Sequence, residues 1–424
     1  MSEWKLKPVS SLGDIVTGST PQTARKDFYG GDYYLISPAE LDIGKYVRSA
    51  AKRLTKLGFQ QCRALPENAV LVGCIGNVGK LGIVGNNRSA TNQQINALVC
   101  NSDHDPEFVY YCFHQNRKEL ERRAVKTTLP ILNKTNFGTF EVRVPPLPEQ
   151  KKIAHILSTV QRAIEEQERI IQTTTELKKA LMHKLFTEGL RNEPQKQTEI
   201  GPIPKSWEIV ELGAYFQIKH GFAFDGKFFG LSGDFILMTP GNFHEEGGFR
   251  DRGDRTKYYT GEVPKDYILA KDDLVVAMTE QTPGLLGSAA FVPESAIYLH
   301  NQRLGLITDL DAAHLSKRFL FAAFNLPHLR EEVAKTSTGS KVKHTSPTKL
   351  RAVKVALPPT LKEQEEIAEA LATTDRKIAT AATKKSLFRN LFRTLLHDLM
   401  TAKMRVSNEE ILECNHKRNE SHES

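Results

Sequence analysis

Two segments rich in basic and hydroxyl side chains carry the strongest chemical signal in the sequence. Residues 335–354 read KTSTGSKVKHTSPTKLRAVK and contain no Asp or Glu, and residues 122–134 are also free of acid. Lys and Arg neutralise phosphates, while Ser, Thr and backbone N–H groups donate hydrogen bonds to phosphate oxygens. A solvated surface loop is the alternative for each segment. The residues that we predict to contact phosphate are Arg122, Arg123, Lys126, Lys134, Lys335, Lys341, Lys343 and Lys349.

Other polar side chains could read base edges in a DNA groove. In the major groove, Arg and Lys recognise guanine, and Asn and Gln recognise adenine. Polar surface residues are common, so each candidate rests on its side-chain type alone. The candidates for base contacts, all in regions expected to be rich in β-strands, are Arg25, Lys26, Asn77, Lys80, Lys219, Gln281 and Arg303.

Motifs for catalysis are absent from the sequence. The stretch GCIGNVGKLG, from Gly73, is similar to a phosphate-binding loop, but Cys74 replaces the first glycine of G-x-x-x-x-G-K and Leu81 replaces the Ser or Thr after Lys80. A glycine-rich turn between strands is the better interpretation. G-x-S-x-G, H-E-x-x-H and the methyltransferase signature N-P-P-Y do not occur. We therefore expect no catalytic residue, no metal ligand and no cofactor bound by this chain.

Composition narrows the class of protein. The chain has 424 residues, of which 40% are hydrophobic, and at roughly 150 residues per domain this length predicts two or three globular domains. Five cysteines without a C-x-x-C pair argue against a disulfide scaffold or a zinc ribbon and fit a reducing cytoplasm. No apolar run approaches the ~18 residues of a membrane helix, so we expect a cytoplasmic protein. A net charge of +8 permits a polyanionic partner without requiring one.

The elements that position these residues occur twice. The segments VPPLPEQKKIAHIL, from Val144, and LPPTLKEQEEIAEAL, from Leu357, align through their Glu-Gln pairs, and LMHKLFT later aligns with LLHDLMT. Weaker matches join Trp4 to Trp207, and Asn92-Gln93 to Asn301-Gln302. The period of a little over 200 residues indicates a duplicated domain. The two basic segments fall at the same place in both copies, which strengthens their functional interpretation.

Each copy ends in a sequence typical of one long helix. Seam positions alternate in steps of four and three from Ile153 to Leu185 and from Ile367 to Leu399, a period of 3.5 that predicts supercoiled pairing. About 38 residues at 1.5 Å each make a rod of about 57 Å, too long for one small domain to cover. Two helices that pack only on their own domains are the alternative. Apolar positions outside the seam predict a partner helix: Ile156, Ile170, Leu387 and Leu391.

These features predict an α+β fold, a tandem duplication in which a β-rich domain precedes each long helix. Prolines at 145, 146 and 148, and at 358 and 359, are expected to mark the helix starts, because proline does not fit a helix interior. The expected organisation is a first β-rich domain at 1–148, a helix at 149–190, a linker at 191–206, a second β-rich domain at 207–361, a helix at 362–404 and a polar, disordered tail at 405–424.

Several joined motifs resemble the specificity subunit of type I restriction-modification enzymes. LGDIVTGSTPQ is similar to that family's glycine-Thr-Pro turn, here Gly18, Thr20 and Pro21, and Thr20 is added to the DNA-binding candidates. VPPLPEQKKIAHIL is similar to its Pro-Pro-Leu-x-Glu-Gln junction, and LKKALMHKLFTEGLR to its central link. The second copy departs from the pattern, since GFAF stands where the first copy has GSTP and PPTLKEQ carries one extra residue.

The resemblance implies a non-catalytic DNA reader. In that family each β-rich half is a target-recognition domain that binds one part of a bipartite double-stranded DNA site. The long helices pair, scaffold two methyltransferase subunits and set the spacing, and restriction subunits join the complex. S-adenosylmethionine, Mg²⁺ and ATP are expected only on those partners. Copies related by a two-fold axis would pair their helices as an antiparallel coiled coil.

Two other functions stay open at the level of the sequence. A methyltransferase or nuclease with its own chemistry would need a cofactor or nuclease motif, and none is recognisable. A purely structural coiled-coil adaptor would show no preference among DNA sequences.

Overall fold

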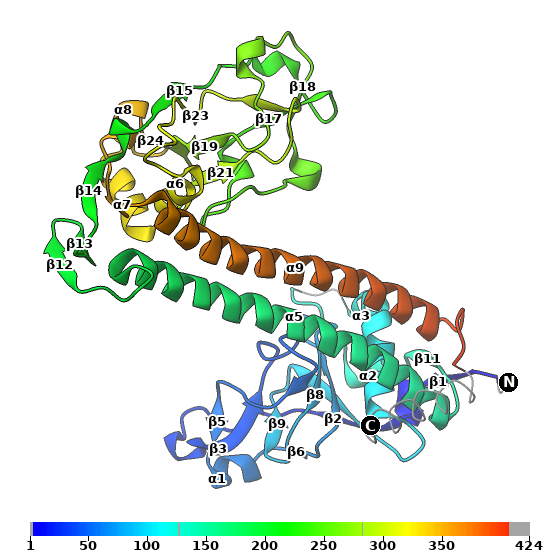
Figure 1. Cartoon of the computed structure of the whole chain (residues 1–424). Helices are drawn as coiled ribbons and strands as arrows, with labels where there is room; N and C mark the ends of the chain where they lie inside the picture. The colour runs from blue at the N-terminus through cyan, green and yellow to red at the C-terminus, as the bar shows by residue number, and fades with distance from the viewer. Residues whose placement is uncertain (1–2, 126–127, 282, 407–424) are drawn as a thin grey trace, which may run out of the picture. The chain divides into compact units, whose positions relative to one another are not determined.

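The computed structural model describes residues 3–125, 128–281 and 283–406, and the chain divides into two compact units. Unit 1 comprises residues 1–168 and 382–424, and unit 2 comprises residues 169–381. The division cuts both long helices, α5 (Leu147–Glu188) and α9 (Leu361–Met400), so each unit holds one β-rich copy and one part of each helix (Figure 1). No helix among the described residues is long and apolar enough to cross a membrane.

Unit 1 is built around a five-stranded sheet in the order β2-β10-β7-β8-β4, beside a second sheet in the order β5-β3-β9-β6. The central strands β10 and β7 are antiparallel, with Ala97 opposite Leu71, and both residues are buried. Helix α2 packs on β7 and β8. The elements of unit 1 before α5 are β1 (Lys5–Pro8), β2 (Gly13–Thr17), β3 (Tyr29–Ile36), β4 (Tyr46–Val47), β5 (Arg53–Leu54), α1 (Lys56–Gln60), β6 (Ala64–Leu65), β7 (Val70–Gly73), β8 (Leu81–Val84), β9 (Ser89–Thr91), β10 (Ile95–Cys100), α2 (Pro106–Gln115), α3 (Arg117–Arg122), α4 (Lys134–Gly138) and β11 (Glu141–Val144).

Unit 2 repeats this plan, as the duplicated sequence predicts. Its main sheet has the order β15-β23-β19-β21, and its second sheet pairs β17 with β22 in parallel, as unit 1 pairs β3 with β9. The elements of unit 2 between α5 and α9 are β12 (Gln195–Thr198), β13 (Gly201–Pro204), β14 (Glu208–Glu211), β15 (Gln217–His220), β16 (Phe229–Gly230), β17 (Phe235–Met238), β18 (Tyr258–Tyr259), β19 (Leu274–Ala277), β20 (Thr279–Glu280), β21 (Ala289–Phe291), β22 (Tyr298–His300), β23 (Leu304–Thr308), α6 (Lys317–Phe324), α7 (Pro327–Lys335), β24 (Lys343–His344), α8 (Pro347–Arg351) and β25 (Lys354–Leu357).

The start of each long helix follows the proline signals with one difference. Pro145 and Pro146 precede α5, but Pro148 is its second residue. Its missing N–H has no cost there, because the first-turn amides of a helix lack intrahelical partners. Glu149 and Glu363 lie in the first turns of α5 and α9, where negative charge is favourable.

The repeated Glu-Gln pair ties each helix to its own globular part. Glu149 accepts a hydrogen bond from the Trp4 indole at 3.4 Å, and Glu363 accepts one from Trp207 at 3.3 Å. Gln150 is 1% exposed. Its amide donates to the carbonyls of residues 103 and 145, and its carbonyl accepts the N–H of residue 105, the N-cap of α2.

The same clamp is built in unit 2. Gln364, also 1% exposed, donates to the carbonyls of His314 and Pro358 and accepts the N–H of Ser316, the N-cap of α6. The Glu-Gln pair that anchors the sequence repeat is therefore one structural device used twice.

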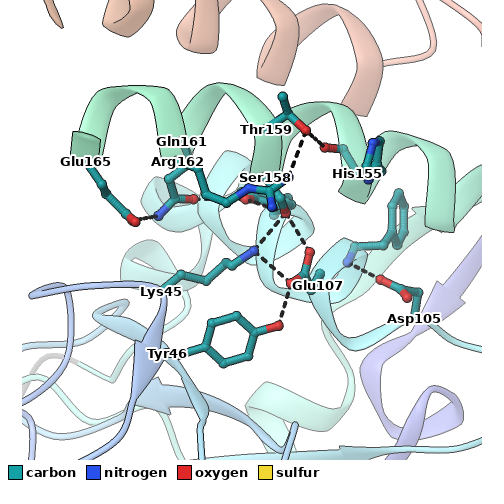
Figure 2. A network of polar contacts seen from close by, with 12 residues as sticks. Lys45, Tyr46, Asp105, Glu107, His155, Ser158, Thr159, Gln161, Arg162 and Glu165 are labelled. Carbon is teal, nitrogen blue, oxygen red and sulfur yellow. Dashed lines mark hydrogen bonds and ion pairs between the residues drawn. The ribbon is translucent and has the colours of Figure 1, made fainter. Parts of the chain in front are cut away.

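In unit 1, a buried polar network also connects the globular part to the first part of α5. Figure 2 shows Lys45 and Tyr46 directed at Glu107 of α2 and Ser158 of α5. The Lys45 ammonium lies 2.8 Å from the Glu107 carboxylate and 2.7 Å from the Ser158 hydroxyl, which donates to Glu107 at 2.5 Å. Tyr46 also donates to Glu107, and Tyr111 bonds Ser158 at 3.1 Å. Ala372 occupies the position of Ser158 in the repeat, so this network belongs to the first copy alone.

The helix parts pack against each other within each unit. In unit 1, Leu157 of α5 and Leu399 of α9 belong to one buried cluster, and Glu168 pairs with Lys385 at 3.1 Å and Arg389 at 2.8 Å. The beginning of α5 thus meets the end of α9, which is an antiparallel arrangement.

Unit 2 pairs the other parts of the helices in the same sense. Leu185, near the end of α5, shares a buried cluster with Ile367 and Leu371, near the start of α9, and Lys178 pairs with Asp375 at 2.6 Å. Every predicted seam position from Ile153 to Leu185 and from Ile367 to Leu399 is buried or half-buried. The predicted seam and its antiparallel pairing are therefore confirmed within each unit.

Each unit also borrows a helix end from the other copy of the repeat. Leu396, Leu399 and Met400, which close the second copy in sequence, complete the core of unit 1. Phe186, which closes the first copy, stacks on Phe319 at 5.2 Å in unit 2. The alternative of two helices that pack only on their own domains is therefore wrong.

The apolar positions outside the seam divide into two groups. Leu387 and Leu391 are exposed, with accessible fractions of 62% and 45%, as predicted. Ile156 instead packs on the core of unit 1, and Ile170 is half-buried. A period of 3.5 places Ile156 beside the seam, and the globular part of unit 1 covers that flank of the helix.

Candidate nucleic-acid interface

The glycine-rich turn and the basic segment of unit 1 lie side by side. Residues 74–78, which we call turn 1, connect β7 to Gly79 and β8. Ile75 forms an antiparallel bridge with Ile131, the Gly76 N–H donates to the Pro130 carbonyl at 3.0 Å, and the Leu132 N–H donates to the Cys74 carbonyl at 2.8 Å. The glycine-rich turn and the basic segment, which are separate in the sequence, thus form one surface.

Unit 2 brings the equivalent segments together by the same means. Residues 278–286, which we call turn 2, follow β19, and their first part is strand β20. Strand β20 pairs with β24 inside the basic segment, with Thr279 opposite His344 and Glu280 opposite Lys343. The same two segments lie together in both copies. The candidate interface in each unit is therefore this edge of the main sheet, by which we mean the end at which β7 or β19 finishes.

A third segment joins the candidate interface in both units. The Asn92 side chain accepts the Gln94 N–H at 3.0 Å, and the Gln94 carbonyl accepts the Cys74 N–H of turn 1. Asn301 likewise accepts the Arg303 N–H at 3.1 Å, and the Arg303 carbonyl accepts the Met278 N–H of turn 2. The repeated Asn-Gln pair therefore marks a turn that supports the glycine-rich connection.

Glycine is required where the neighbouring loop crosses this turn. A Cβ atom at Gly18 would lie 2.1 Å from the Asn92 carbonyl oxygen, and one at Gly221 would lie 1.9 Å from the Asn301 carbonyl oxygen. Thr20, two residues beyond Gly18, donates to the Gln93 side chain at 2.6 Å. The family-like GSTP turn of the first copy therefore lies at the candidate interface.

Several predicted contact residues are exposed at or beside this edge. Turn 1 carries Asn77 and turn 2 carries Gln281, both exposed, and Arg303 is exposed on the Asn-Gln turn. Among the described contacts, the ammonium groups of Lys341 and Lys343 have no hydrogen bond or ion pair. The other exposed members are Arg122, which pairs with Glu119 at 3.1 Å, Lys134 at the start of α4, and Lys335, which lies 3.8 Å from Glu332.

Other candidates use their charged groups within the fold. The Lys80 ammonium donates to the Pro38 carbonyl at 3.1 Å, and Lys349 donates to the Thr336 carbonyl at 2.7 Å. Arg123 donates to the Thr139 carbonyl and lies over the Phe140 ring. Lys219 donates to the Asp266 carbonyl at 2.6 Å and lies over the Tyr267 ring.

Arg25 and Lys26 lie outside the joined turn and basic segment. Arg25 is exposed and bonded to Asp27, and Lys26 begins a short 3-10 helix that packs on α1, at the second sheet. Lys126 falls outside the described residues, as does residue 407 onward of the tail predicted at 405–424. Arg405, at the start of that tail, is instead held by an ion pair with Glu149 at 2.7 Å.

Prediction from the sequence did not identify some residues that shape this edge. Glu280 and Arg330 hold turn 2, and no periodicity or motif marks either of them. Arg351 stands in the basic segment, but it donates to the Phe216 and Gly213 carbonyls and is therefore turned inward. A run of basic residues in the sequence does not separate such internal donors from free ones.

The site offers positive charge and hydrogen-bond donors. The described residues contain no group of three or more His, Cys, Asp or Glu that could hold a metal ion. Lysines without an internal partner beside exposed amide and guanidinium groups suit a polyanion that carries readable polar edges.

Comparison with known proteins gives a consistent result. The family described as "Type I restriction modification DNA specificity domain" matches residues 1–174 and 204–387. The chain is similar to the type I restriction enzyme MjaVIII specificity subunit of Methanocaldococcus jannaschii, with 26% identity over 96% of this chain and 94% of that protein.

Solved structures show the same fold. One neighbour is the crystal structure of the type I restriction-modification system S subunit from M. genitalium, with a TM-score of 0.64, 17% identity, and coverage of 93% of this chain and 96% of that chain. A second comes from work on complex assembly and conformational transition of the type I R-M system, with a TM-score of 0.50, 15% identity, and coverage of 94% and 98%.

Proposed function

This chain belongs to the family of type I restriction-modification specificity subunits, and from that premise we propose that it reads a bipartite DNA target, one part with each unit. It is a DNA-recognition component of such a system and not its catalytic subunit. The target-recognition domains would comprise residues 1–148 and 207–361. The helices at 149–190 and 362–404 would set the spacing between the two parts of the target.

The observation that carries this proposal is the repeated edge of the two units. Each unit places a turn with an exposed amide side chain, Asn77 or Gln281, against a basic segment. Phosphate contacts would hold the protein in register on the duplex, and the exposed amides would read bases. Since the turns differ in length and side chains, the two units would read different sequences.

The partners follow from the same premise. We propose that two methyltransferase subunits bind the paired helices and that restriction subunits join through the complex. Leu177, Leu387 and Leu391 are exposed on the helices and would be covered by a partner helix. S-adenosylmethionine, Mg²⁺ and ATP would bind to these partners, which would supply methyl transfer and cleavage.

Mapping methylated adenines across a genome tests the function. The chain should be co-expressed with the methyltransferase encoded beside it, in a host that lacks related systems. We expect methylation at one motif made of two short sequence blocks separated by a fixed gap. Methylation without a shared motif would support a structural adaptor instead, and methylation by the chain without its partner would support an enzyme.

Removing the two free lysines of unit 2 should weaken DNA binding without changing sequence preference. For Lys341→Ala/Lys343→Ala, the slope of log K against log salt concentration should fall by about 2, because each lost phosphate contact releases about 0.9 fewer counterions. Titration of labelled duplex at several salt concentrations measures the slope. Lys354→Ala is the control, because Lys354 already pairs with Glu199 at 2.8 Å. An unchanged slope in the double variant would place this segment away from DNA.

A further inference from the structure

The glycine-rich turns of the two units close alike but differ in length. The Gly79 N–H donates to the Gly73 carbonyl at 3.0 Å, and the Gly287 N–H donates to the Ala277 carbonyl at 2.8 Å. Gly79 and Gly287 both have positive φ, +84° and +77°, which favours glycine at each closure. Between these closures, turn 1 has five residues (74–78) and turn 2 has nine (278–286). Turn 2 is thus the longer connection at the candidate interface.

A buried carboxylate holds the far part of turn 2. One oxygen of Glu280, a residue that is 6% exposed, accepts the N–H groups of Gly284, Leu285 and Leu286, each at 2.9 Å. A charged acceptor with three backbone donors makes strong hydrogen bonds that fix the local backbone. Glu280 directly precedes the exposed Gln281 in the sequence. The contacts that hold Glu280 therefore also restrict the backbone position of Gln281.

A guanidinium bonds the backbone carbonyls in the same part of turn 2. Arg330, on α7, donates to the Leu286 carbonyl at 2.7 Å, to the Gly284 carbonyl and to the Glu245 carbonyl at 3.2 Å. Burial lowers the pKa of Arg330 to about 10, so the side chain is still a cation at neutral pH. Arg330 therefore joins turn 2 to α7 and to the neighbouring loop at Glu245.

Unit 1 has a different support for its shorter turn. A Cβ atom at Gly79 would lie 3.0 Å from Arg117, whose guanidinium pairs with Asp42 at 2.7 Å rather than with turn 1. Among the described residues, side chains therefore bond both the backbone N–H groups and the backbone carbonyls of turn 2, whereas turn 1 has no such pair of contacts.

We propose that Glu280 and Arg330 are positioning residues for base reading by unit 2, because they fix turn 2 and thereby hold Gln281 beside the basic strand β24. This inference rests on the proposed function. A connection whose backbone is held at Glu280 and at residues 284–286 before binding loses less conformational freedom on binding, and it presents fewer arrangements of donors and acceptors to the bases. Loosening it should reduce discrimination between sequences more than attraction to phosphate, since Lys343 lies on β24 and Lys341 two residues before it, outside turn 2.

The test uses the full chain in complex with its methyltransferase and the target motif found by methylation mapping. Binding is measured to three duplexes: the target, the target with only the unit 2 block scrambled, and the target with only the unit 1 block scrambled. Domain exchange of residues 1–143 assigns each block to its unit. Glu280→Gln and Arg330→Lys keep the size and polarity of each side chain while weakening its hydrogen bonds to turn 2. The control is Arg318→Met, which removes an exposed arginine from α6.

Glu280→Gln and Arg330→Lys should each lower discrimination against the scrambled unit 2 block by about tenfold or more. Discrimination against the scrambled unit 1 block and the salt slope should stay as in the wild type, as should the fluorescence of the buried Trp207 measured on the full chain in a Trp4→Phe background. A fall in the salt slope and in Trp207 fluorescence together with the loss at the unit 2 block would indicate that unit 2 has unfolded and would overturn a positioning role. Unchanged discrimination at both blocks in both variants would also overturn it. A wild-type complex without sequence preference would instead refute the proposed function.

Discussion

Replacing Glu107 with Ala should lower the free energy of unfolding of unit 1 by about 3–5 kcal/mol, because it leaves the Lys45 ammonium buried without its counter-ion. The Lys45 side chain is only 10% exposed and lies 2.8 Å from Glu107. Ser158 and Tyr46 also lose the carboxylate that accepts their hydrogen bonds. Removal of both charges in Lys45→Met/Glu107→Leu should recover much of the loss, because an apolar pair carries no desolvation penalty.

The two tryptophans allow each unit to be followed separately. Trp4 lies in unit 1 against Phe108, and Trp207 is buried in unit 2. Urea unfolding of Glu107→Ala in a Trp207→Phe background reports unit 1, and a Trp4→Phe background reports unit 2. The effect should be larger at Trp4. An equal loss at both tryptophans, or no loss at either, would contradict a role confined to unit 1.

The pH dependence of the same carboxylate gives a further check. Burial alone would raise the pKa of Glu107, but the bonds from Lys45, Ser158 and Tyr46 outweigh it and hold this pKa below its usual value. A carboxyl with a lowered folded-state pKa stabilises the fold above its unfolded pKa, about 4.3, and loses that contribution as pH falls through the folded value. The stability difference between wild type and Glu107→Gln should therefore shrink below about pH 4.

Gln150→Leu and Gln364→Leu should each lower the free energy of unfolding by about 3 kcal/mol. Each change leaves one N–H and two carbonyls around a buried side chain without their partner, and a buried unsatisfied group costs about 1–3 kcal/mol. Leucine has nearly the size of glutamine, so the loss reports hydrogen bonding more than packing.

The two glutamine variants serve as controls for each other. Gln150→Leu should act mainly on the Trp4 signal and Gln364→Leu mainly on the Trp207 signal during urea unfolding. Gln172→Leu makes the same change at an exposed position of α5 and should alter stability by no more than about 0.5 kcal/mol. A buried variant as stable as Gln172→Leu would show that water replaces the lost bonds.

Local periodicity was sufficient to predict the long helices and their seam. The 3.5-residue spacing from Ile153 to Leu185 depends only on neighbours along one helix, and the repeat supplied its counterpart. The exchange of helix ends between the copies was not predictable, because it depends on which of two similar apolar faces meets which globular part. Strands β12 and β13 were also missed within the expected linker, since Pro202 and Pro204 argue against a strand except in a short hairpin such as this one.

The candidate interface was predictable in its parts and not in its assembly. The basic segments and the glycine-rich turn stood out by composition, but the bridge between Ile75 and Ile131 joins residues far apart in sequence and has no local signal. The division of the lysines was equally hidden. Lys349 and Lys341 look alike in sequence, and only the fold shows that Lys349 bonds the Thr336 carbonyl.

The borrowed helix ends imply that the order of folding differs from the order of synthesis. Unit 2 is one continuous stretch, residues 169–381, whereas unit 1 lacks Leu396, Leu399 and Met400 until α9 has been made. At about 5–20 residues per second, the ribosome needs about 10–45 s to add the intervening residues. During that time the first part of α5 leaves its apolar seam uncovered in the nascent chain. The unit that is translated first is therefore the last to complete its core, and slower translation of the second half would lengthen its exposure to aggregation and to chaperones.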